Sequence, residues 1–440
     1  MAFIEGEARG QATMFPVTLD ELIPADHVCR VIEAFVGRLQ MRELRFGRAE
    51  AAETGRPGYD PRDLLKLYLY GYLHQVRSSR RLEAECRRNI EVMWLLGRLV
   101  PDHKTIAEFR RMQSEAVSQA GAELIRFARE VGLVRGEWMA IDGSKFRAVS
   151  SSDSVHERRA LERYLERMEQ ADAEEEIEID SKAVAAALEK LRQHPEPEAR
   201  FMRTRSGKVP AYNVQTVVDA EHALIVTHQV SDEATDNRSL QPMAETAQAA
   251  LGGRGTPIHV VADAGYSNGE QAEACEKRGI VTHVPAVRGV NNRGDGTLFQ
   301  RGDFQYDEVT DTFGCPAGER LYRHQRKERW MVYAGQPGVC GACALRSRCT
   351  VGSRRLLKRH LYGEALDRMR ERATGEAMRL RRSLAEHPFA ALKYQIFGHP
   401  RFLLRGLRGA RTEISLGVMA YNLKRMINVV GAMRLTAQLA

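Results

Sequence analysis

The first 135 residues carry apolar side chains at helical spacing. Asp60 and Pro61 form a typical helix start, an N-cap residue followed by proline at the first helical position. Apolar residues then recur every three or four positions, at Leu64, Leu65, Leu67, Tyr68, Tyr72 and Leu73. The pattern predicts a further helix that starts at Ser79 with a capping-box-like sequence and runs to about Leu96, and another opened by Asp102. We therefore expect an all-helical N-terminal domain over residues 1–135.

A different pattern begins at Glu137. Residues 138–142 have the composition of a short strand ending at Gly143, and the β-rich runs 212–218 and 223–230 predict a hairpin. Helices and strands then alternate, with a helix over 237–251, a strand over 258–262, a helix over 268–278 and a strand over 280–284. This order predicts an α/β fold, a mixed sheet with flanking helices.

Two segments interrupt the alternation. Residues 150–200 are strongly charged and poor in large apolar side chains, which predicts a solvent-exposed helical insertion. Residues 288–374 lose the regular pattern and contain four of the seven cysteines. Helical periodicity returns after Glu376 and persists to the C-terminal end. We expect a second domain over residues 136–440, with a helical insertion and a cysteine-containing insertion.

Composition narrows the class of protein. Of the 440 residues 43% are hydrophobic and 28% are charged, which is typical of a folded soluble chain. The formal charge of +8 favours a polyanionic partner. No apolar run approaches the roughly 20 residues that cross a bilayer, and the first residues lack a signal-peptide pattern. Seven cysteines, an odd and unevenly spaced set, argue against a disulfide scaffold. These features predict a cytoplasmic protein.

Two aspartates follow apolar strands. Asp142 and Asp263 each stand at the C-terminal end of an expected strand, so both are expected at one edge of the sheet, where α/β folds build their sites. Two neighbouring carboxylates repel each other unless they are protonated or a cation neutralises them, and hard divalent ions prefer oxygen ligands. The pair therefore predicts a metal site, and a site for two ions would need a third carboxylate.

Glu386 is the best candidate for the third carboxylate. Arg382 precedes it by four residues and Lys393 follows it by seven, so all three side chains share one face of a helix. Pro388 disfavours helix at the residue before it, which leaves open a helix that begins there with Glu386 at its edge. Glu413 is the competing acid, but the apolar residues around it indicate a buried helix with a structural salt bridge.

The cysteines of the second insertion have the spacing of metal ligands. Cys340 and Cys343 form a C-x2-C pair, Cys349 follows six residues later, and Cys315 lies upstream. Four thiolates would complete a tetrahedral structural zinc site. Reduced surface cysteines are the alternative. The remaining cysteines have apolar, helical surroundings and are expected in the core: Cys29, Cys86 and Cys275.

Basic residues indicate where a polyanion would bind. Arginines of the N-terminal domain are expected on helix surfaces at Arg80, Arg81, Arg87, Arg88, Arg110 and Arg111. Short helices joined by tight turns and bearing such residues predict a helix-turn-helix-like DNA-binding unit, with a plain helical bundle as the alternative. Further basic residues lie at 320–329, 354–359 and 401–434. Phosphate contacts of this kind give salt-dependent affinity that is largely independent of base sequence.

The acidic blocks together resemble a known family. The three block sequences are Ala-Ile-Asp-Gly-Ser-Lys at 140–145, Asp-Ala-Gly-Tyr-Ser at 263–267, and Glu-His-Pro-Phe at 386–389 followed by Lys393. The chain resembles bacterial insertion-sequence transposases of the DDE superfamily, in the group with a cysteine-containing insertion before the last acidic motif. The likeness extends to Tyr-Asn-Val-Gln at 212–215 and Thr-Gly-Arg-Pro at 54–57, and it covers nearly the whole chain.

The resemblance implies a ribonuclease H-like catalytic domain in which Asp142, Asp263 and Glu386 hold two Mg²⁺ or Mn²⁺ ions. It implies a DNA transposase that cleaves transposon ends and transfers the strands into target DNA. The partners would be double-stranded DNA, as terminal inverted repeats and target, and a second copy of the chain, beside the bacterial nucleoid. The alternatives are a catalytically silent DNA-binding protein derived from a transposase, and a metal-dependent nuclease.

The same resemblance implies which basic residues contact DNA. Lys393 and Arg382 match the last motif and are expected to contact phosphates near the cut. Lys145, in the first motif, is expected to bind DNA. Arg80 and Arg81 are expected to bind DNA from the N-terminal domain. The tyrosine that opens the last motif in many members is Arg379 here.

Overall fold

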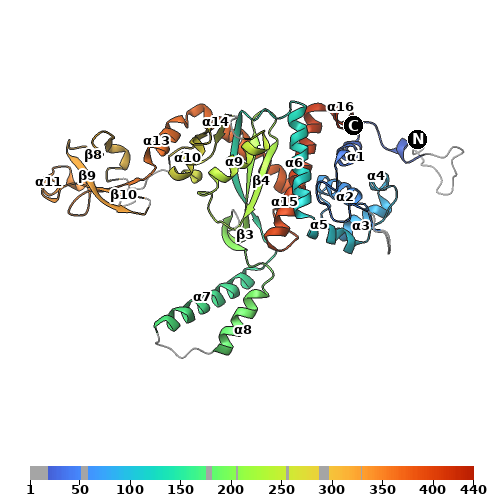
Figure 1. Ribbon diagram of the computed structural model, residues 1–440, viewed down its shortest axis with the longest axis horizontal. Coiled ribbons are helices and arrows are strands. Elements are labelled where there is room, and N and C mark those ends of the chain that lie inside the picture. Colours follow the sequence, from blue (N-terminus) through green and yellow to red (C-terminus); the bar gives the residue numbers. More distant parts are fainter. Residues whose placement is uncertain are drawn as a thin grey trace, which may run out of the picture.

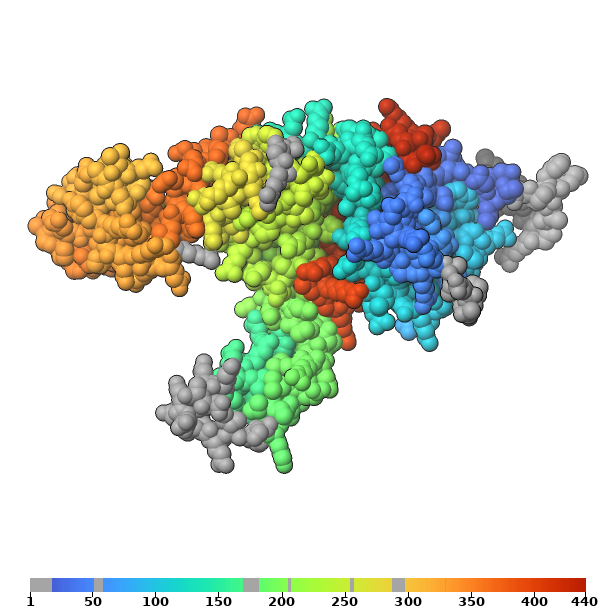
Figure 2. All heavy atoms as spheres, viewed as in Figure 1, coloured from blue at the N-terminus to red at the C-terminus, as the bar shows by residue number. Residues whose placement is uncertain are grey.

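The computed structural model describes residues 18–50, 58–174, 181–204, 207–253, 257–286, 297–328 and 330–440. The N-terminal helices occupy one end of the molecule, a mixed sheet lies in the centre, and a smaller sheet forms a lobe at the other end (Figures 1 and 2). The motif at 54–57 lies outside the described residues. Among the described helices, none is long and apolar enough to cross a membrane.

The N-terminal part is helical, as its periodicity predicts. Its helices are α1 (Val28–Arg38), α2 (Pro61–Leu73), α3 (Ser79–Arg88), α4 (Ile90–Leu95), α5 (His103–Met112) and α6 (Ser114–Glu130), preceded by the 3₁₀ turn η1 (Asp20–Leu22). The two expected N-caps are confirmed: Asp60 accepts from the backbone N–H of Arg62, and Asp102 accepts from those of Lys104 and Thr105. Capped ends and apolar stripes therefore define these helices from local sequence alone.

The expected helix from Ser79 to Leu96 is wrong in its length. It breaks at Asn89, whose backbone is extended (φ −102°, ψ 118°). The Asn89 side chain accepts from the N–H of Glu91 and so caps a new helix, α4, while its amide donates to Glu85 and Tyr70. The N-cap of α3 is Ser78, without a capping hydrogen bond, instead of a capping box at Ser79. Local side-chain hydrogen bonds thus outweigh helix continuation at this asparagine.

The central sheet is mixed. Its strands are β1 (Trp138–Arg147), β2 (Arg200–Thr204), β3 (Gly207–Asp219), β4 (Ile225–Ser231), β5 (Ile258–Val261) and β6 (Ile280–His283). They follow the order β2-β3-β1-β5-β6, and β4 pairs with β3. β1, β3 and β4 run antiparallel, whereas β1, β5 and β6 run parallel. The α/β class and the hairpin are confirmed, and this is the ribonuclease H-like arrangement that the resemblance implies.

Helices cover both faces of this sheet. α9 (Leu240–Ala250) and α10 (Gly269–Glu276) pack on one face, and α14 (Gly375–Ala390) and α15 (Gly406–Val430) on the other. α15 is bonded to the sheet where His228 of β4 and Ser415 share a hydrogen bond of 2.9 Å. α15 also packs on α2 and α6, and α16 (Ala432–Leu439) packs on α1. The N-terminal helices and the sheet consequently share one hydrophobic core.

The helix that carries Glu386 does not begin beside Pro388. α14 starts at Gly375, where Thr374 caps it, runs through Pro388, and continues as the π-helical turn η4 (Ala391–Ile396). The alternative start is therefore wrong. Pro388 is buried, so its ring contributes packing that offsets the backbone hydrogen bond it cannot donate.

The two insertions have different structures. α7 (Ser152–Glu174) and α8 (Ser181–Arg192) form the expected helical arm, which projects from the sheet (Figure 1). The cysteine-containing insertion is a folded lobe, which its irregular pattern did not predict. Its sheet has the order β11-β10-β9-β8-β7, built from β7 (Gln305–Asp307), β8 (Thr312–Gly314), β9 (Arg320–Lys327), β10 (Trp330–Ala334) and β11 (Leu356–His360), with η3 (Arg301–Asp303), α11 (Pro337–Ala342) and α12 (Arg346–Cys349). α13 (Gly363–Arg372) leads back to α14.

Candidate active site

The two aspartates meet where β5 ends. Asp142 lies in the middle of β1, not at its C-terminal end as expected, because β1 continues to Arg147 in partnership with β3. β5 pairs with β1 only as far as Ala140, so Asp142 lies just beyond the end of its parallel neighbour. Asp263 follows β5 and caps the 3₁₀ turn η2 (Ala264–Tyr266) by accepting from the N–H of Gly265 at 2.8 Å.

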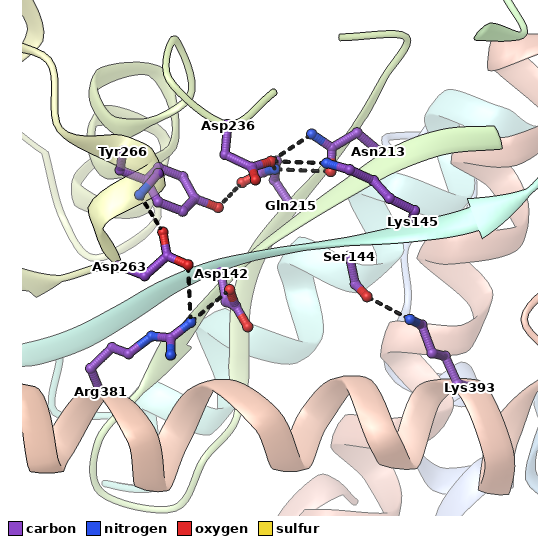
Figure 3. Close-up of polar contacts among 11 residues, drawn as sticks. Asp142, Ser144, Lys145, Asn213, Gln215, Asp236, Asp263, Tyr266, Arg381 and Lys393 are labelled. Carbon is purple, nitrogen blue, oxygen red and sulfur yellow. Dashed lines mark hydrogen bonds and ion pairs between the residues drawn. The ribbon is translucent and has the colours of Figure 1, made fainter. Parts of the chain in front are cut away.

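One guanidinium group bridges the two carboxylates. Nη2 of Arg381, on α14, lies 3.1 Å from Oδ1 of Asp142 and 3.6 Å from Oδ2 of Asp263 (Figure 3). The Asp142 side chain is 16% exposed, and its burial raises its pKa to about 6, although Arg381 acts in the opposite direction. The site is thus a pair of carboxylates, one of them largely buried, that shares a single cation.

Arg381 is the residue that the sequence interpretation missed. Its neighbour Arg382 matches the family motif, but Arg382 is exposed, and its Nε donates to the backbone carbonyl of Met378. Arg381 precedes the buried residues Leu384 and Ala385 by three and four positions, so it shares the helix face that packs on the sheet. That position in the helical repeat was the available signal.

Glu386 is not in contact with the aspartates. It is exposed on α14, five residues after Arg381. Among the described residues, the oxygens of Asp142, Asp263 and Glu386 do not form a group within 4.8 Å of one another. The structure therefore brings two of the three predicted carboxylates together and places the third on the helix that supplies their counter-ion.

Lys393 ties the same helix to the strand that bears Asp142. Its Nζ donates to Oγ of Ser144 at 2.5 Å (Figure 3). The same Nζ lies 5.4 Å from the centroid of the Phe146 ring. Ser144 and Asp142 are two residues apart on β1 and face the same side of the sheet. α14 and η4 therefore lie along β1, with the positive charges of Arg381 and Lys393 at the two contacts.

A polar network lies on the opposite face of β1 from Asp142 and Ser144. Oδ1 of Asp236, in the segment between β4 and α9, accepts from Lys145 at 3.1 Å, from Asn213 at 2.7 Å and from Gln215 at 2.6 Å. The Tyr266 hydroxyl, in the turn after Asp263, donates to Oε1 of Gln215 (Figure 3). The network joins β1, β3 and the turn after β5, so it fixes the strands that carry both aspartates relative to each other.

This network also places residues of the first two motifs. Lys145 is only 16% exposed and is paired with Asp236, so its predicted DNA contact would require this ion pair to open. A Cβ atom on Gly143 would lie 2.7 Å from Oδ1 of Asp236. Any side chain at position 143 would therefore collide with Asp236, which explains why a glycine follows Asp142. Asp236 had no sequence signal beyond its single negative charge.

Glu413 has the structural role expected of it. It is fully buried on α15, where its Oε2 lies 3.2 Å from Nη1 of Arg77. Its Oε1 accepts from the backbone N–H groups of Leu403 and Leu404 at 2.7 and 2.6 Å. The Tyr72 hydroxyl of α2 also lies 3.4 Å from Oε2, so these contacts tie α15 to the N-terminal helices and confirm the structural salt bridge.

The four cysteines of the lobe line one cavity of about 80 Å³. The cavity lies between the start of β9, the turn after β10, α11 and α12, and Tyr322 of β9 borders it together with Cys315, Cys340, Cys343 and Cys349. The pKa of Cys349 is raised, chiefly by burial and further by the three other thiols. No three of the four sulfurs lie within 4.8 Å of one another, so among the described residues they are gathered but not in a closed ligand sphere. The other three cysteines are buried, as predicted.

A second group of metal-ligating atoms has a simpler explanation. Ligand atoms of His27, Cys29 and Glu91 lie within 4.8 Å of one another. Nδ1 of His27 accepts from the N–H of Cys29 and caps α1, which leaves the proton on Nε2, 3.4 Å from Glu91. Burial raises the pKa of the Cys29 thiol to about 12. A capping imidazole and a protonated thiol account for this group without a metal.

The arginines of the N-terminal helices divide into exposed and buried ones. Arg80 and Arg81 are exposed on α3, which packs against α5. Arg110 is 4% exposed, which corrects its expected surface position. Its guanidinium lies over the Tyr68 ring and donates to the carbonyl of Arg77. Helical periodicity places Arg110 beside Phe109 at the edge of the apolar face, where its long stem can be buried.

Comparison with known proteins identifies both parts of the chain. Residues 17–112 match the family "Transposase domain (DUF772)", and residues 171–423 match the family "Transposase DDE domain". No curated protein matches. Among solved structures, the piggyBac transposase synaptic complex with hairpin DNA is similar, with 7% identity and a TM-score of 0.32, over 94% of this chain and 76% of that chain. The second family match alone spans more than half of the 440 residues. The chain belongs to the DDE transposase family.

Proposed function

We propose that this protein is a DNA transposase that cuts phosphodiester bonds at transposon ends and joins the freed strands to target DNA. Asp142, Asp263 and Glu386 are the proposed ligands of two Mg²⁺ or Mn²⁺ ions. The observation that carries the proposal is the bridging of Asp142 and Asp263 by the single cation of Arg381. Two carboxylates that already share a cation can exchange it for a divalent one.

The donor set fits a hard divalent cation. Carboxylate oxygens are the ligands that Mg²⁺ prefers, and the network around Asp236 holds the strands of Asp142 and Asp263 in place. Bound there, the ions would activate the attacking hydroxyl and neutralise charge on the scissile phosphate. Arg381 would leave the two carboxylates, and α14 would rotate or shift to bring Glu386, now exposed five residues further on, toward them.

Basic residues beside this site supply the DNA contacts. Lys393 already lies along the strand of Asp142, where it can bind a phosphate next to the cut. Arg382 is exposed on the same helix, and Arg80 and Arg81 would hold the transposon end from α3. Because two ends must be joined, the active form is a homodimer, which we place in the cytoplasm beside the nucleoid.

A plasmid assay tests the proposal against both alternatives. A supercoiled plasmid that carries matched terminal repeats is incubated with the protein, with and without Mg²⁺. We expect nicking and joining at the repeats only with the metal. Binding of the repeats without any cleavage would support a silent DNA-binding protein. Metal-dependent cleavage that ignores the repeats would support a nuclease.

Loss of Arg381 should tighten metal binding to the free protein. In Arg381→Gln the metal no longer competes with a bound guanidinium, and removal of one nearby charge changes affinity by roughly tenfold or more at an effective dielectric constant near 20. Mn²⁺ titration followed by electron paramagnetic resonance measures this. Arg382→Gln, on the exposed side of the same helix, should leave the affinity unchanged. Equal or weaker binding in Arg381→Gln would contradict the exchange of cations.

We also propose a structural Zn²⁺ ion bound by Cys315, Cys340, Cys343 and Cys349. The shared cavity supports it, and four thiolates are a usual zinc sphere. Elemental analysis should find about one zinc per chain, lost in Cys343→Ser together with protection of the lobe from protease. The matched control is Cys275→Ala, which removes a buried cysteine far from the cavity in sequence and should keep the zinc. Zinc-free protein with a protease-resistant lobe would rule this site out.

A further inference from the structure

The sheet of the lobe has two unlike faces. One face packs on the small core of the lobe, where Leu321, Met331, Tyr333 and Leu357 are buried with Phe304 and Phe313. Directly paired residues lie on the same side of a sheet, so the register defines the other face. It consists of Tyr322, Gln325 and Lys327 of β9, Trp330, Val332 and Ala334 of β10, and Leu356, Lys358 and His360 of β11. We call these nine residues the outer face.

The outer face exposes large apolar side chains. Tyr322 is 49% exposed, Trp330 is 42% exposed and Leu356 is 52% exposed. Tyr322, Ala334 and Leu356 form one cross-strand row, and Lys327, Trp330 and His360 form another. The two rows are four residues apart along β10, roughly 13 Å at the rise of a β-strand. Val332, between the two rows, and Ala334 are each only 6% exposed, so this surface presents two separate aromatic rings and no continuous apolar patch.

The charge on the outer face selects the kind of partner. Lys327 is the register partner of Trp330, and Lys358 lies between Leu356 and His360 on β11; both lysines are exposed. None of the nine residues is acidic. Arg354 adds positive charge at the edge, where it contacts His324 at 3.1 Å. The core of a protein–protein interface is depleted of lysine, whereas aromatic rings between cations suit a nucleic-acid strand.

Unpaired bases fit this surface better than a duplex does. In a duplex the flat faces of the bases are stacked on one another, so exposed rings have nothing to stack on, and only the phosphates are available. In a single strand every base offers a π face, and stacking on aromatic side chains is tolerant of sequence. Tyr322 and Trp330 would stack on bases while Lys327 and Lys358 contact the phosphates between them.

One end of the outer face, at the buried His360, lies at the junction with the central sheet. The lobe is inserted between β6 and the α13–α14 segment that carries Arg381 (Figure 1). His360, at the end of β11, packs closely against α10. A Cβ atom added to Gly269 of α10 would lie only 3.0 Å from Nδ1 of His360. We propose that the outer face binds an unpaired stretch of DNA, freed when a strand is cut at the transposon end. This inference rests on the proposed transposase function.

Tryptophan fluorescence of the full-length protein tests the inference. The chain has three tryptophans, so the difference between wild type and Trp330→Phe isolates the signal of Trp330. We expect a 15-mer of oligo-dT to quench this signal, and a duplex of equal length to leave it unquenched. Trp330→Ala and Tyr322→Ala should each weaken single-strand binding about tenfold. Trp330→Phe retains a ring and should retain binding.

Matched controls separate stacking from loss of the fold. Val351→Ala changes a residue of the same lobe that is 66% exposed but lies outside the outer face, and it should bind normally. Lys327→Gln with Lys358→Gln should reduce the salt dependence of binding. Equal oligo-dT affinity in Trp330→Ala and wild type would overturn the inference, as would quenching by duplex alone. The inference would also be overturned if Trp330→Ala sedimented as a monomer where the wild type is a dimer, while its DNA binding was unchanged. The outer face would then be a contact between two copies of the chain.

Failure of this inference is distinguishable from failure of the proposed function. Single-strand binding at the outer face does not require the carboxylates, so Asp142→Asn should quench normally with oligo-dT. If plasmid cleavage occurs but Trp330→Ala binds oligo-dT like wild type, the outer face is wrong and the transposase stands. If no metal-dependent cleavage occurs at all, the proposed function fails.

Discussion

Asp142→Asn and Asp263→Asn should each lower metal-dependent strand cleavage by roughly 10³-fold or more. The amide keeps the size of the carboxylate but removes the charge that holds a divalent cation, and charge stabilisation at the reacting phosphate is the largest catalytic contribution at such sites. The measurement is the rate of nicking of a supercoiled plasmid that carries the terminal repeats. Binding of the repeats, followed by gel shift, should change less than twofold because phosphate contacts come from other residues.

Glu386→Gln should show the same loss, and it has a matched control on its own helix. Glu376→Gln alters an exposed acid in the first turn of α14 and should cleave at the wild-type rate. Wild-type cleavage by either aspartate variant would remove the replaced aspartate from the site and contradict the proposed metal pair. A normal rate for Glu386→Gln alone would leave the aspartate pair intact and assign the third ligand elsewhere.

Glu413→Gln should lower the free energy of unfolding by about 3–5 kcal/mol. The change leaves the buried guanidinium of Arg77 without its counter-ion, and it replaces an acceptor of two backbone N–H groups with an amide that can clash with one of them. Denaturant titration measures the effect. Glu123→Gln, which removes an exposed pair with Arg126, should cost less than about 1 kcal/mol.

The role of Glu413 can be separated from catalysis by a double replacement. Arg77→Met with Glu413→Leu removes both charges together, and such pairs recover much of the lost stability. At a temperature where it is folded, this variant should cleave DNA with the wild-type metal requirement. A folded Glu413→Gln protein that no longer binds Mn²⁺ would instead make Glu413 the third ligand.

The sequence predicts the layers of this fold better than it predicts its longer-range contacts. Helix starts at Asp60 and Asp102 depend on neighbouring backbone groups, and strands 258–262 and 280–284 are short runs rich in valine and isoleucine, so local patterns suffice. The break at Asn89 comes from its local cap on the N–H of Glu91, supported by a longer-range hydrogen bond to Tyr70, and helical periodicity reveals neither contact. The strands of the lobe are short and one side is rich in basic residues, so their alternation is hidden.

The candidate site shows the same division. Asp142 and Asp263 could be named because each follows an apolar strand, yet β1 runs past Asp142 since its partner β3 is long. Asp236 could not be named, and for Arg381 the signal was limited to its position in the helical repeat. Their importance comes from tertiary contacts, a bridge between two strands for Arg381 and three donors on one oxygen for Asp236. Charges of this kind are common on surfaces, and only the packed fold distinguishes them.

The most direct measurement is the anomalous scattering of Mn²⁺ in crystals of the protein bound to a transposon-end DNA. The account predicts manganese between the carboxylates of Asp142 and Asp263, with a Glu386 oxygen in the coordination sphere and Arg381 turned away from both aspartates. Manganese bound elsewhere, or Arg381 still bridging the aspartates beside the DNA phosphate, would contradict it.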